Sequence, residues 1–365
     1  MERKLATYRP PDFAVLGLQN AADCNFEPAP ADAVLPKGFL CTTNFPTYVR
    51  AGGAWRMPED PRMDSHIVWD KDSNRLLVRE FRNVSKGDLV AIAAAEDGSE
   101  GIYVWDKGFK APSDGTHHAE AFSFMSSDVS REKPVDYDGI LAALKKNRGE
   151  NGHIIWVIGP ALVHSRGRAA MDWLIRNGYC HALLTGNAVP VHDIEMALFG
   201  STLGMYSDGS PAAGGHNLHM KAINAVKHAG SIEAICKDGQ VESGIMKACV
   251  DMGVPYVICG SIRDDGPLPE TITDAGESQD AMRVQTVQAT MVVMVATALH
   301  AIAVGNMLAT FCTRPDGSLD ELATIVVDQT EFLVSKLKDR GTHQAFGVVT
   351  NAQDFMRVLQ LELTE

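Results

Sequence analysis

One stretch near the middle of the chain limits its possible folds more than any other. Residues 154–159 are almost all apolar and do not alternate with polar side chains, which is typical of a parallel strand covered on both faces. Gly159 and Pro160 end this strand, and a helical pattern runs from Ala161 to Ile175. Unpaired N–H groups at the start of such a helix can bind an anion such as a pyrophosphate. The G-x-G-x-x-G spacing is absent, so an ordinary strand–turn–helix remains the alternative.

The same alternation of strand and helix continues toward the end of the chain. Further strands are predicted at residues 182–184, 254–260, 291–297, 324–327 and 347–349, and helices at residues 192–199 and 221–229. Repeated alternation of this kind predicts an α/β fold with a doubly wound parallel sheet. In such a sheet the ligand lies beyond the carboxyl ends of the strands.

A small β-rich domain is predicted before this region. Its candidate strands lie at residues 67–69, 75–79, 89–93 and 101–105, with turn residues between them that indicate a meander or small barrel. A helix at residues 138–147 and a polar segment at 148–152 connect it to the sheet. We therefore expect a β-rich domain at residues 1–133, a connecting helix and hinge at 134–152, and a Rossmann-like domain at 153–365.

The composition excludes several classes of partner. A formal net charge of -13 leaves no basic excess for phosphates, so neither nucleic acid nor an anionic membrane is expected, and a cationic substrate suits the charge. No 18-residue apolar span and no apolar segment after Met1 occur, which argues against a membrane protein. Seven cysteines without a C-x-x-C pair indicate free thiols in a reducing cytoplasm. His216 and His219 lack a third ligand of fixed spacing, so no metal is expected.

Two predicted strand ends carry residues suited to ligand binding. Gly186 allows close backbone approach and Asn187 both donates and accepts hydrogen bonds, while His192 and Asp193 follow in the next helical turn. A simple turn, with Asp193 as a helix cap, is the alternative. Asp328 ends another strand, where an acidic residue could accept hydrogen bonds from a ribose diol or cap a turn.

The loop at residues 261–269 combines one arginine with two adjacent carboxylates. Asp264 and Asp265 could hold an ammonium group or exchange a proton. Arg263 would lower the pKa of one carboxyl, and their mutual repulsion would raise the pKa of the other. The alternative is a structural Arg–Asp pair that orders a turn. In the first domain, residues 38–44 and 124–134 also carry many hydrogen-bonding groups, which turn and cap chemistry explains equally well.

Several longer strings of this chain resemble one known family. They lie at residues 30–39, 42–44, 124–127, 132–134, 159–161, 163–164, 186–188, 191–195, 261–269 and 300–306. The chain resembles the NAD-dependent ornithine cyclodeaminase family of archaea and cyanobacteria over about residues 27–360. In cyanobacteria this family forms the C-terminal half of a bifunctional arginine dihydrolase.

The resemblance implies a β-rich domain followed by a Rossmann-like domain of the deoxyhypusine-synthase type, which binds NAD without G-x-G-x-x-G. It also implies a reaction: NAD takes hydride from the α-carbon of ornithine, the δ-amine attacks the imine, ammonia leaves, and the hydride returns to give proline. We also expect a homo-oligomer, either a dimer or a tetramer.

Site residues follow from the resemblance position by position. Those expected at the cofactor are Gly159, Pro160, Ala161, His164, Gly186, Asn187, Ala188, Asp193, Ser261, Ile262, Arg263, Asn306 and Asp328. Those expected on the substrate side are Thr43, Asn44, Arg50, Ser126 and Ser127. The reaction needs a base for the α-ammonium group and a carboxylate for the δ-ammonium group, for which Asp264 and Asp265 are the candidates. Lys133 or His192 could manage the other proton.

The chain departs from the family pattern at positions close to these residues. Cys41 stands where Ser is expected, Ile158 where Gly is expected, and Gln329 and Thr330 where Ile-Asn is expected. Because these positions lie beside the expected substrate and ribose contacts, they weaken the expectation that ornithine is the substrate more than the expectation that NAD is the cofactor. An NAD-dependent oxidoreductase of another amino or imino acid, or a non-enzymatic NAD-binding sensor, are the alternatives. A nucleophilic role for Cys41 is not expected, because no Cys-His-Asn pattern surrounds it.

Overall fold

The computed structural model describes residues 8–109, 135–264, 266–314, 317–331, 334 and 345–364. The chain forms two compact units. One consists of residues 1–140 together with 309–321, and the other of residues 141–308 together with 322–365. The predicted boundaries assign everything after residue 153 to the second domain, whereas the short segment 309–321 belongs to the first unit.

A seven-stranded parallel sheet in the order β13-β12-β9-β8-β14-β17-β18 forms the centre of the second unit. Its strands are β8 (Ile154–Ile158), β9 (Ala182–Gly186), β12 (Tyr256–Cys259), β13 (Thr271–Ile272), β14 (Met291–Val295), β17 (Ala323–Asp328) and β18 (Ala345–Val349). No residue of β8 or β14 is more than 1% exposed. The predicted parallel strand covered on both faces is thereby confirmed.

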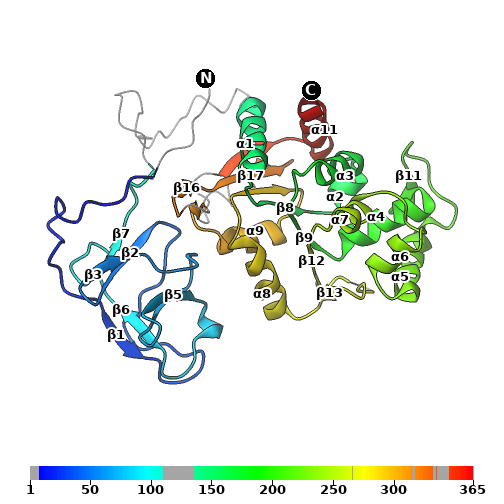
Figure 1. Ribbon diagram of the computed structural model, residues 1–365. Coiled ribbons are helices and arrows are strands. Elements are labelled where there is room, and N and C mark those ends of the chain that lie inside the picture. The colour runs from blue at the N-terminus through cyan, green and yellow to red at the C-terminus, as the bar shows by residue number, and fades with distance from the viewer. Residues whose placement is uncertain are drawn as a thin grey trace. The chain divides into compact units, whose positions relative to one another are not determined.

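Helices cover this sheet on both faces. They are α1 (Tyr137–Gly149), α2 (Ala161–His164), α3 (Arg168–Arg176), α4 (Ala188–Phe199), α5 (Leu218–Ala229), α6 (Ile232–Lys237), α7 (Ile245–Met252), α8 (Ala275–Thr286), α9 (Leu299–Met307) and α11 (Ala352–Thr364). Figure 1 shows α8 and α9 on one side of the central strands and α3, α4 and α7 on the other. The described part of this unit is an α/β, Rossmann-like fold, as the sequence predicted.

Two helix boundaries differ from the sequence-based prediction. The single helix predicted from Ala161 to Ile175 is wrong, because α2 ends at His164 and α3 begins at Arg168. Arg166 adopts a left-handed backbone with φ 67°, and Gly167 N–H donates 2.9 Å back to the Leu162 carbonyl, which closes the first helix. The predicted helix at 192–199 begins earlier, at Ala188.

A hairpin and a short helical turn occupy the glycine-rich segment that follows α4. Strands β10 (Ser201–Thr202) and β11 (Met205–Tyr206) pair antiparallel, and the 3-10 helix η3 (Gly215–Asn217) precedes α5. Gly204 and Gly215 lie back to back, since a Cβ atom on Gly204 would be 2.8 Å from the carbonyl carbon of Gly215. Both positions therefore require glycine.

The first unit is built from small antiparallel sheets. A four-stranded sheet has the order β1-β6-β4-β5, a three-stranded sheet has the order β3-β2-β7, and β15 pairs with β16. The elements are β1 (Asn25–Pro28), β2 (Thr47–Ala51), β3 (Ala54–Arg56), β4 (His66–Asp70), β5 (Arg75–Arg79), η1 (Phe81–Asn83), β6 (Leu89–Ile92), β7 (Ile102–Val104), β15 (Phe311–Thr313) and β16 (Leu319–Glu321). The β-rich character and its predicted strands at 67–69, 75–79, 89–93 and 101–105 are confirmed.

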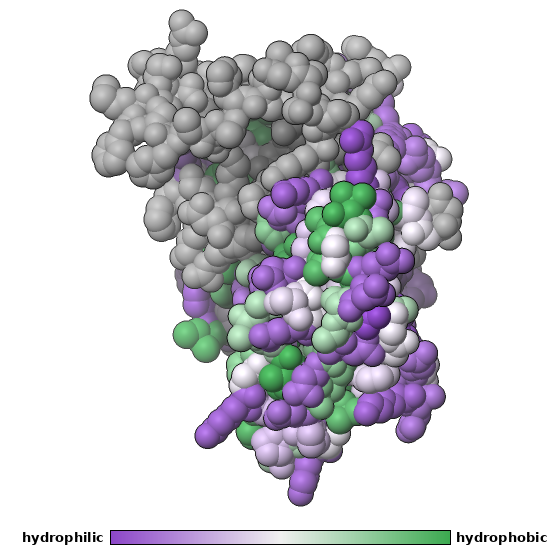
Figure 2. Space-filling model, turned by 90° about the vertical axis from the view of Figure 1, so that its left-hand side faces the viewer, coloured by the Kyte–Doolittle hydropathy of each residue, from purple (hydrophilic) through white to green (hydrophobic). Residues whose placement is uncertain are grey.

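One core joins the two larger sheets of this unit. Val49 and Ile102 from the three-stranded sheet pack in the same buried cluster as Ile67, Leu76 and Ala91 from the four-stranded sheet. Of the two topologies predicted for this region, a meander or a small barrel, the meander is not observed, because β1 pairs with β6 and β2 pairs with β7. Figure 2 shows one face of this unit, where hydrophobic residues are interspersed among hydrophilic ones. None of the helices that the structure describes has the length and apolar character needed to span a membrane.

Candidate functional site

The order of strands creates a topological switch point in the parallel sheet. After β8 the chain adds β9, β12 and β13 on one side, and then returns to add β14, β17 and β18 on the other. The connections therefore diverge between the carboxyl ends of β8 and β14. This topological switch point is where doubly wound sheets bind their ligands. Of the predicted residues, Gly159 lies directly at it.

Gly159 allows the ends of β8 and β14 to come into direct backbone contact. Its N–H donates 3.0 Å to the carbonyl of Val295. A Cβ atom on Gly159 would lie 1.9 Å from the carbonyl oxygen of Ala296, so no other residue fits here without moving the backbone. Ala296 itself has a φ of 55°, a conformation that L-residues seldom adopt and that is typical of functional sites.

The helix starts around this point differ from the expected arrangement. The helix after Gly159 and Pro160 is α2, which has only four residues, so the long helix expected at this point is not observed, and contact of Ala161 with the cofactor stays a prediction. Two longer helices, α4 and α9, also begin beyond strand ends, after β9 and β14. Neither has an acidic residue in its first turn or a side-chain cap, which leaves their first N–H groups without a carboxylate partner.

Asn187 holds the neighbouring loop in place with its side chain. Its Nδ2 donates 3.3 Å to the Gly266 carbonyl, while its Oδ1 accepts from Leu268 N–H at 3.0 Å and from the Thr271 hydroxyl at 2.8 Å. The side chain is buried. It therefore positions the loop at residues 261–269, while its backbone N–H donates 3.2 Å to the Cys259 carbonyl and its own carbonyl accepts 3.3 Å from Val191 N–H.

The described part of that loop forms a tight turn around Asp264. The carboxylate accepts 2.7 Å from Ser261 N–H, and Ser261 Oγ accepts 3.2 Å from Arg263 N–H. Among the described residues, these backbone N–H groups order the turn, and no ion pair joins Arg263 to Asp264. Ile262 is fully exposed at its tip. Asp265, the second candidate carboxylate, lies outside the described residues.

His300 is a residue at this edge of the sheet to which the sequence analysis assigned no role. It lies in the first turn of α9, and a Cβ atom on Gly186 would be only 2.8 Å from its Cε1 atom. Burial lowers the pKa of His300 by more than the nearby Asp264 carboxylate raises it, so the ring is neutral at neutral pH. The contact joins strand β9 to a helix more than a hundred residues later, which no local sequence pattern reveals.

His192 belongs to a buried polar cluster between α2, α4 and β10. Its Nδ1 lies 2.8 Å from Glu195 Oε2, and its ring centroid lies 4.6 Å from that of His164. His164 Nδ1 in turn lies 2.6 Å from Thr202 Oγ1. Burial and the neighbouring His192 lower the pKa of His164 to about 4, while Glu195 opposes this.

Glu195 is the completely buried carboxylate of that cluster. Burial raises the pKa of its carboxyl, but the hydrogen bond to His192 and the N–H groups of Gly204 and Leu203 lower it by more. The net pKa is below the usual value, so Glu195 is ionised and orients His192. Among the described residues, no group of three or more His, Cys, Asp or Glu side chains is placed to hold a metal ion.

Asp193 is accounted for by a structural role. Its carboxylate is completely buried, lies 2.6 Å from Arg168 Nε, and accepts from the N–H groups of Ile245 at 3.0 Å and Met246 at 2.8 Å. It therefore caps α7, a different helix from its own, and compensates Arg168. We no longer include Asp193 among the cofactor ligands.

The remaining cofactor candidates lie at strand or helix ends of the same unit. Asp328 ends β17, and its Oδ1 accepts from the N–H at 2.9 Å and from the hydroxyl at 2.8 Å of Thr330, one of the family-divergent positions. Asp328 therefore caps a turn, which was the alternative to its predicted contact with a ribose diol. Asn306 lies near the end of α9, and Ala188 begins α4.

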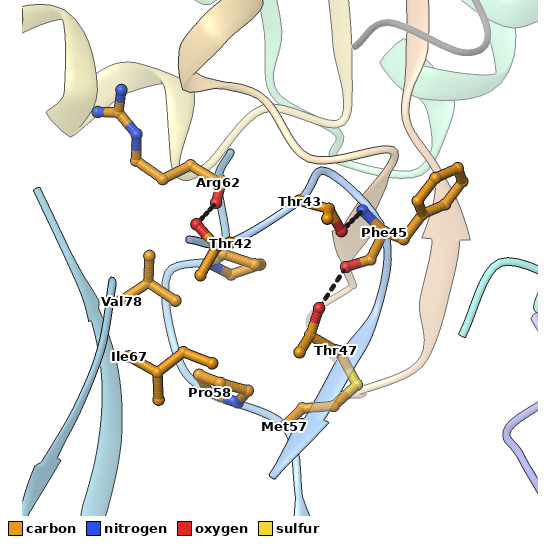
Figure 3. Close-up of a pocket in the computed structure, with 10 residues that line it drawn as sticks. Thr42, Thr43, Phe45, Thr47, Met57, Pro58, Arg62, Ile67 and Val78 are labelled. Atoms are coloured by element: carbon orange, nitrogen blue, oxygen red, sulfur yellow. Dashed lines mark hydrogen bonds between the residues drawn. The ribbon is translucent and has the colours of Figure 1, made fainter. Parts of the chain in front are cut away.

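A small hollow in the first unit contains one of the predicted substrate residues (Figure 3). Thr43 lines it, with Oγ1 accepting 3.2 Å from Phe45 N–H. Thr42 donates 2.7 Å to the Arg62 carbonyl, and Thr47 donates 3.1 Å to the Phe45 carbonyl. The threonine hydroxyls thus bond to the backbone of Arg62 and Phe45, and the remaining wall is largely apolar.

The other substrate-side candidates are placed differently. Asn44 is buried, and its carbonyl accepts 2.9 Å from Thr310 N–H. Arg50 is ion-paired with Asp23 within the same unit, so its guanidinium serves the fold, and we withdraw it as a substrate ligand. Ser126, Ser127 and Lys133 lie outside the described residues.

Comparison with known proteins assigns the chain to a family. Residues 138–359 match the family described as "Arginine dihydrolase ArgZ-like, C-terminal, Rossmann fold", and residues 46–137 match its "C-terminal, first region". A protein named ornithine cyclodeaminase from Methanopyrus kandleri is 41% identical over 344 residues, which cover 93% of this chain and 78% of that protein. The chain belongs to the ornithine cyclodeaminase family of archaea and cyanobacteria.

Solved structures of the ornithine cyclodeaminase family share the fold. A structure described as a conserved putative LOR/SDH protein of Methanococcus maripaludis is 39% identical, with a TM-score of 0.83 over 94% of this chain and 98% of that one. The bifunctional arginine dihydrolase/ornithine cyclodeaminase AgrE of Nostoc sp. is 36% identical over 94% of this chain and 47% of its own length. A structure of AgrE described as a ternary complex with ornithine and NAD+ matches with a TM-score of 0.58 at 34% identity, over 95% of this chain and 47% of that one.

Proposed function

We propose that this protein is an NAD-dependent lyase that converts L-ornithine, or a closely similar cationic amino acid, into L-proline or the corresponding cyclic product and ammonia. The proposal rests on one observation in particular. At the topological switch point the backbone of Gly159 contacts the backbone of Val295 and Ala296 directly, with no side chain between them. Membership of the ornithine cyclodeaminase family supports the reaction class. The AgrE complex with ornithine and NAD+ supports the pairing of substrate and cofactor.

The residues at the switch point fit a dinucleotide. Glycine at 159 and 186 lets the ends of β8 and β9 pack closely against the Ala296 backbone and the ring of His300, which shapes the edge of the sheet beyond these strands. The starts of α4 and α9 supply N–H groups without competing carboxylates, which suits a pyrophosphate. When bound there, NAD supplies a reversible acceptor for one hydride.

The chain's own groups provide the charge and the proton chemistry. Asp264 lies beyond the end of β12 and can hold a cationic amino group of the substrate. The net charge of -13 favours the approach of a cationic amino acid over an anionic one. Departure of the α-nitrogen and closure of the ring onto the δ-nitrogen lead to proline and one ammonia per ornithine.

An isotope experiment tests this function. Pure protein is incubated with L-ornithine labelled with ¹⁵N at the α-amino group and with NAD in an amount far below the substrate. We expect equal amounts of unlabelled proline and ¹⁵N-ammonia, with no net NADH, because the δ-nitrogen is retained in the ring. Absence of proline and ammonia would refute the proposal.

The same incubation separates the alternatives. NADH that accumulates in proportion to substrate consumed indicates an oxidoreductase of an amino or imino acid. NAD that binds by calorimetry without turnover of any diamino acid indicates a non-enzymatic sensor. A screen for ammonia release over diamino acids of different length then identifies the substrate, which the divergent Cys41 and Ile158 leave open.

A further inference from the structure

His300 presents a neutral imidazole at the carboxyl edge of the parallel sheet. It is in the first turn of α9, a helix that packs against both β8 and β9. A Cβ atom on Gly186 would lie 2.8 Å from the ring's Cε1 and 3.4 Å from its Nε2. The ring therefore lies over the end of β9, in space that exists because residue 186 is glycine.

The two nitrogens of this ring have different surroundings. Nδ1 lies 3.4 Å from the hydroxyl oxygen of Thr297, a weak hydrogen bond. None of the residues that the structure describes hydrogen-bonds to Nε2. When Nδ1 carries the proton and donates to Thr297, Nε2 holds a lone pair and is able to accept a proton.

Asp264 supplies the negative charge that such a ring needs once it becomes positive. Its carboxylate acts electrostatically on His300 and is itself fixed by the N–H of Ser261 at 2.7 Å. Asn187 anchors the same loop through three hydrogen bonds. The loop that carries Asp264 is therefore held in place, and the negative charge of Asp264 favours an imidazolium at His300.

The other histidine candidate has a different environment. His192 is 9% exposed and its Nδ1 is bonded to Glu195 inside a cluster with His164. His300 instead contacts Gly186 itself, at the end of strand β9. The geometry therefore favours His300 over His192 for contact with a ligand at the switch point.

We propose that His300 is the proton-transfer residue of this site, an inference that rests on the proposed function. Nε2 accepts a proton from the α-ammonium group of the amino acid: one N–H bond breaks, its electron pair stays on nitrogen, and an imidazolium forms. The same proton later returns to the departing nitrogen. That C–N bond breaks with its electron pair on nitrogen, so ammonia and a neutral imidazole result. Asp264 then holds the cationic end of the substrate and stabilises the imidazolium.

Three variants test the role of His300. His300→Ala removes the ring, His300→Gln keeps most of its volume without a base, and His228→Ala is the control, because His228 is exposed on α5. We expect both His300 variants to lose about 10²–10⁴-fold in kcat, the range typical of a general acid–base residue. NAD affinity by calorimetry should stay within about threefold of wild type, because the ring does not hold the cofactor. Added imidazole should restore His300→Ala at least about tenfold and leave His300→Gln unchanged.

Each outcome bears on a separate claim. If His300→Ala and His300→Gln keep more than about a tenth of the wild-type kcat, or if imidazole restores nothing to His300→Ala, the inference is overturned. Lost NAD affinity in His300→Gln with unchanged kcat at saturating NAD would show a binding role and also overturn it. If the wild-type protein and His228→Ala release no ammonia from ornithine, the proposed function itself fails, and the inference fails with it.

Discussion

Replacement of Gly159 by alanine is the sharpest test of the switch point. The added Cβ atom would meet the carbonyl oxygen of Ala296 at 1.9 Å and its carbonyl carbon at 2.8 Å. Both are backbone atoms, so no rotation of a side chain relieves the clash. To reach the 3.0 Å below which Cβ contacts are essentially never seen, the ends of β8 and β14 must separate by about 1 Å.

The expected cost follows from that movement. Overpacking of a tight site costs about 1–3 kcal/mol, and the upper half of this range applies because the clash is with backbone. The hydrogen bond from Gly159 N–H to the Val295 carbonyl at 3.0 Å is stretched as well. Alanine also makes the unfolded chain less flexible than glycine does, which stabilises the folded state by about 0.4–1 kcal/mol and offsets part of this cost. We therefore expect a net loss of about 2 kcal/mol in the free energy of unfolding.

Denaturant unfolding and NAD calorimetry measure the two consequences, with Gly149→Ala as the matched control. Gly149 lies at the end of α1 and has no atom within 4 Å of an added Cβ, so this variant should be as stable as wild type or slightly more so. We expect Gly159→Ala to bind NAD at least about tenfold more weakly, because a separation of the strand ends misplaces the loops that hold it. If Gly159→Ala unfolds like the control and binds NAD like wild type, the argument for a glycine-dependent cofactor site is refuted.

Three further predictions follow from the same unit. Gly186→Ala should displace the ring of His300, whose Cε1 would be 2.8 Å from the new Cβ, and lower kcat at least about tenfold; unchanged kcat would contradict the contact. Asp193→Asn should lower the free energy of unfolding by about 3 kcal/mol, because it leaves the partly buried Arg168 without a counter-charge; weaker NAD binding at unchanged stability would instead restore Asp193 as a ligand. The depressed pKa of His164, about 4 against 6.5, means that the folded protein resists protonation there, so this group destabilises the fold as pH falls from 6.5 toward 4. Between pH 7 and pH 5, the free energy of unfolding of wild type, measured with urea, should fall by about 1 kcal/mol more than that of His164→Gln, a figure already reduced because the ring is partly in contact with solvent. Equal decreases in the two proteins would contradict the burial of His164.

Local sequence patterns predicted the elements whose cause is local. The unbroken apolar run at residues 154–158 is a strand covered on both faces because nothing else buries five consecutive apolar residues so completely. The helix predicted through residue 175 is interrupted at Arg166, which adopts a left-handed backbone. The chain must turn there for α3 to pack, and helix propensity does not encode that turn. Propensity is a weak prior that tertiary packing overrides.

Some residues of the candidate site could likewise be predicted from the sequence, and others could not. Glycine at 159 and 186 and the carboxylate of Asp264 could be identified in the sequence, because strand ends followed by such residues are a known arrangement. The roles of Asn187, Asp193 and Arg50 could not, because each depends on a hydrogen-bond partner that lies far away in sequence. A side chain that looks free for a ligand in the sequence is often already used by the fold.

The sequence by itself determined the α/β class, the β-rich region before it, and the family, because periodicity and long motif strings are properties of neighbouring residues. Tertiary structure alone decided that the ends of β8 and β14 meet at Gly159, that His300 lies over Gly186, and that residues 309–321 pack with the first unit. These contacts join segments that are far apart along the chain. Their energy comes from close packing in three dimensions, which no local pattern records.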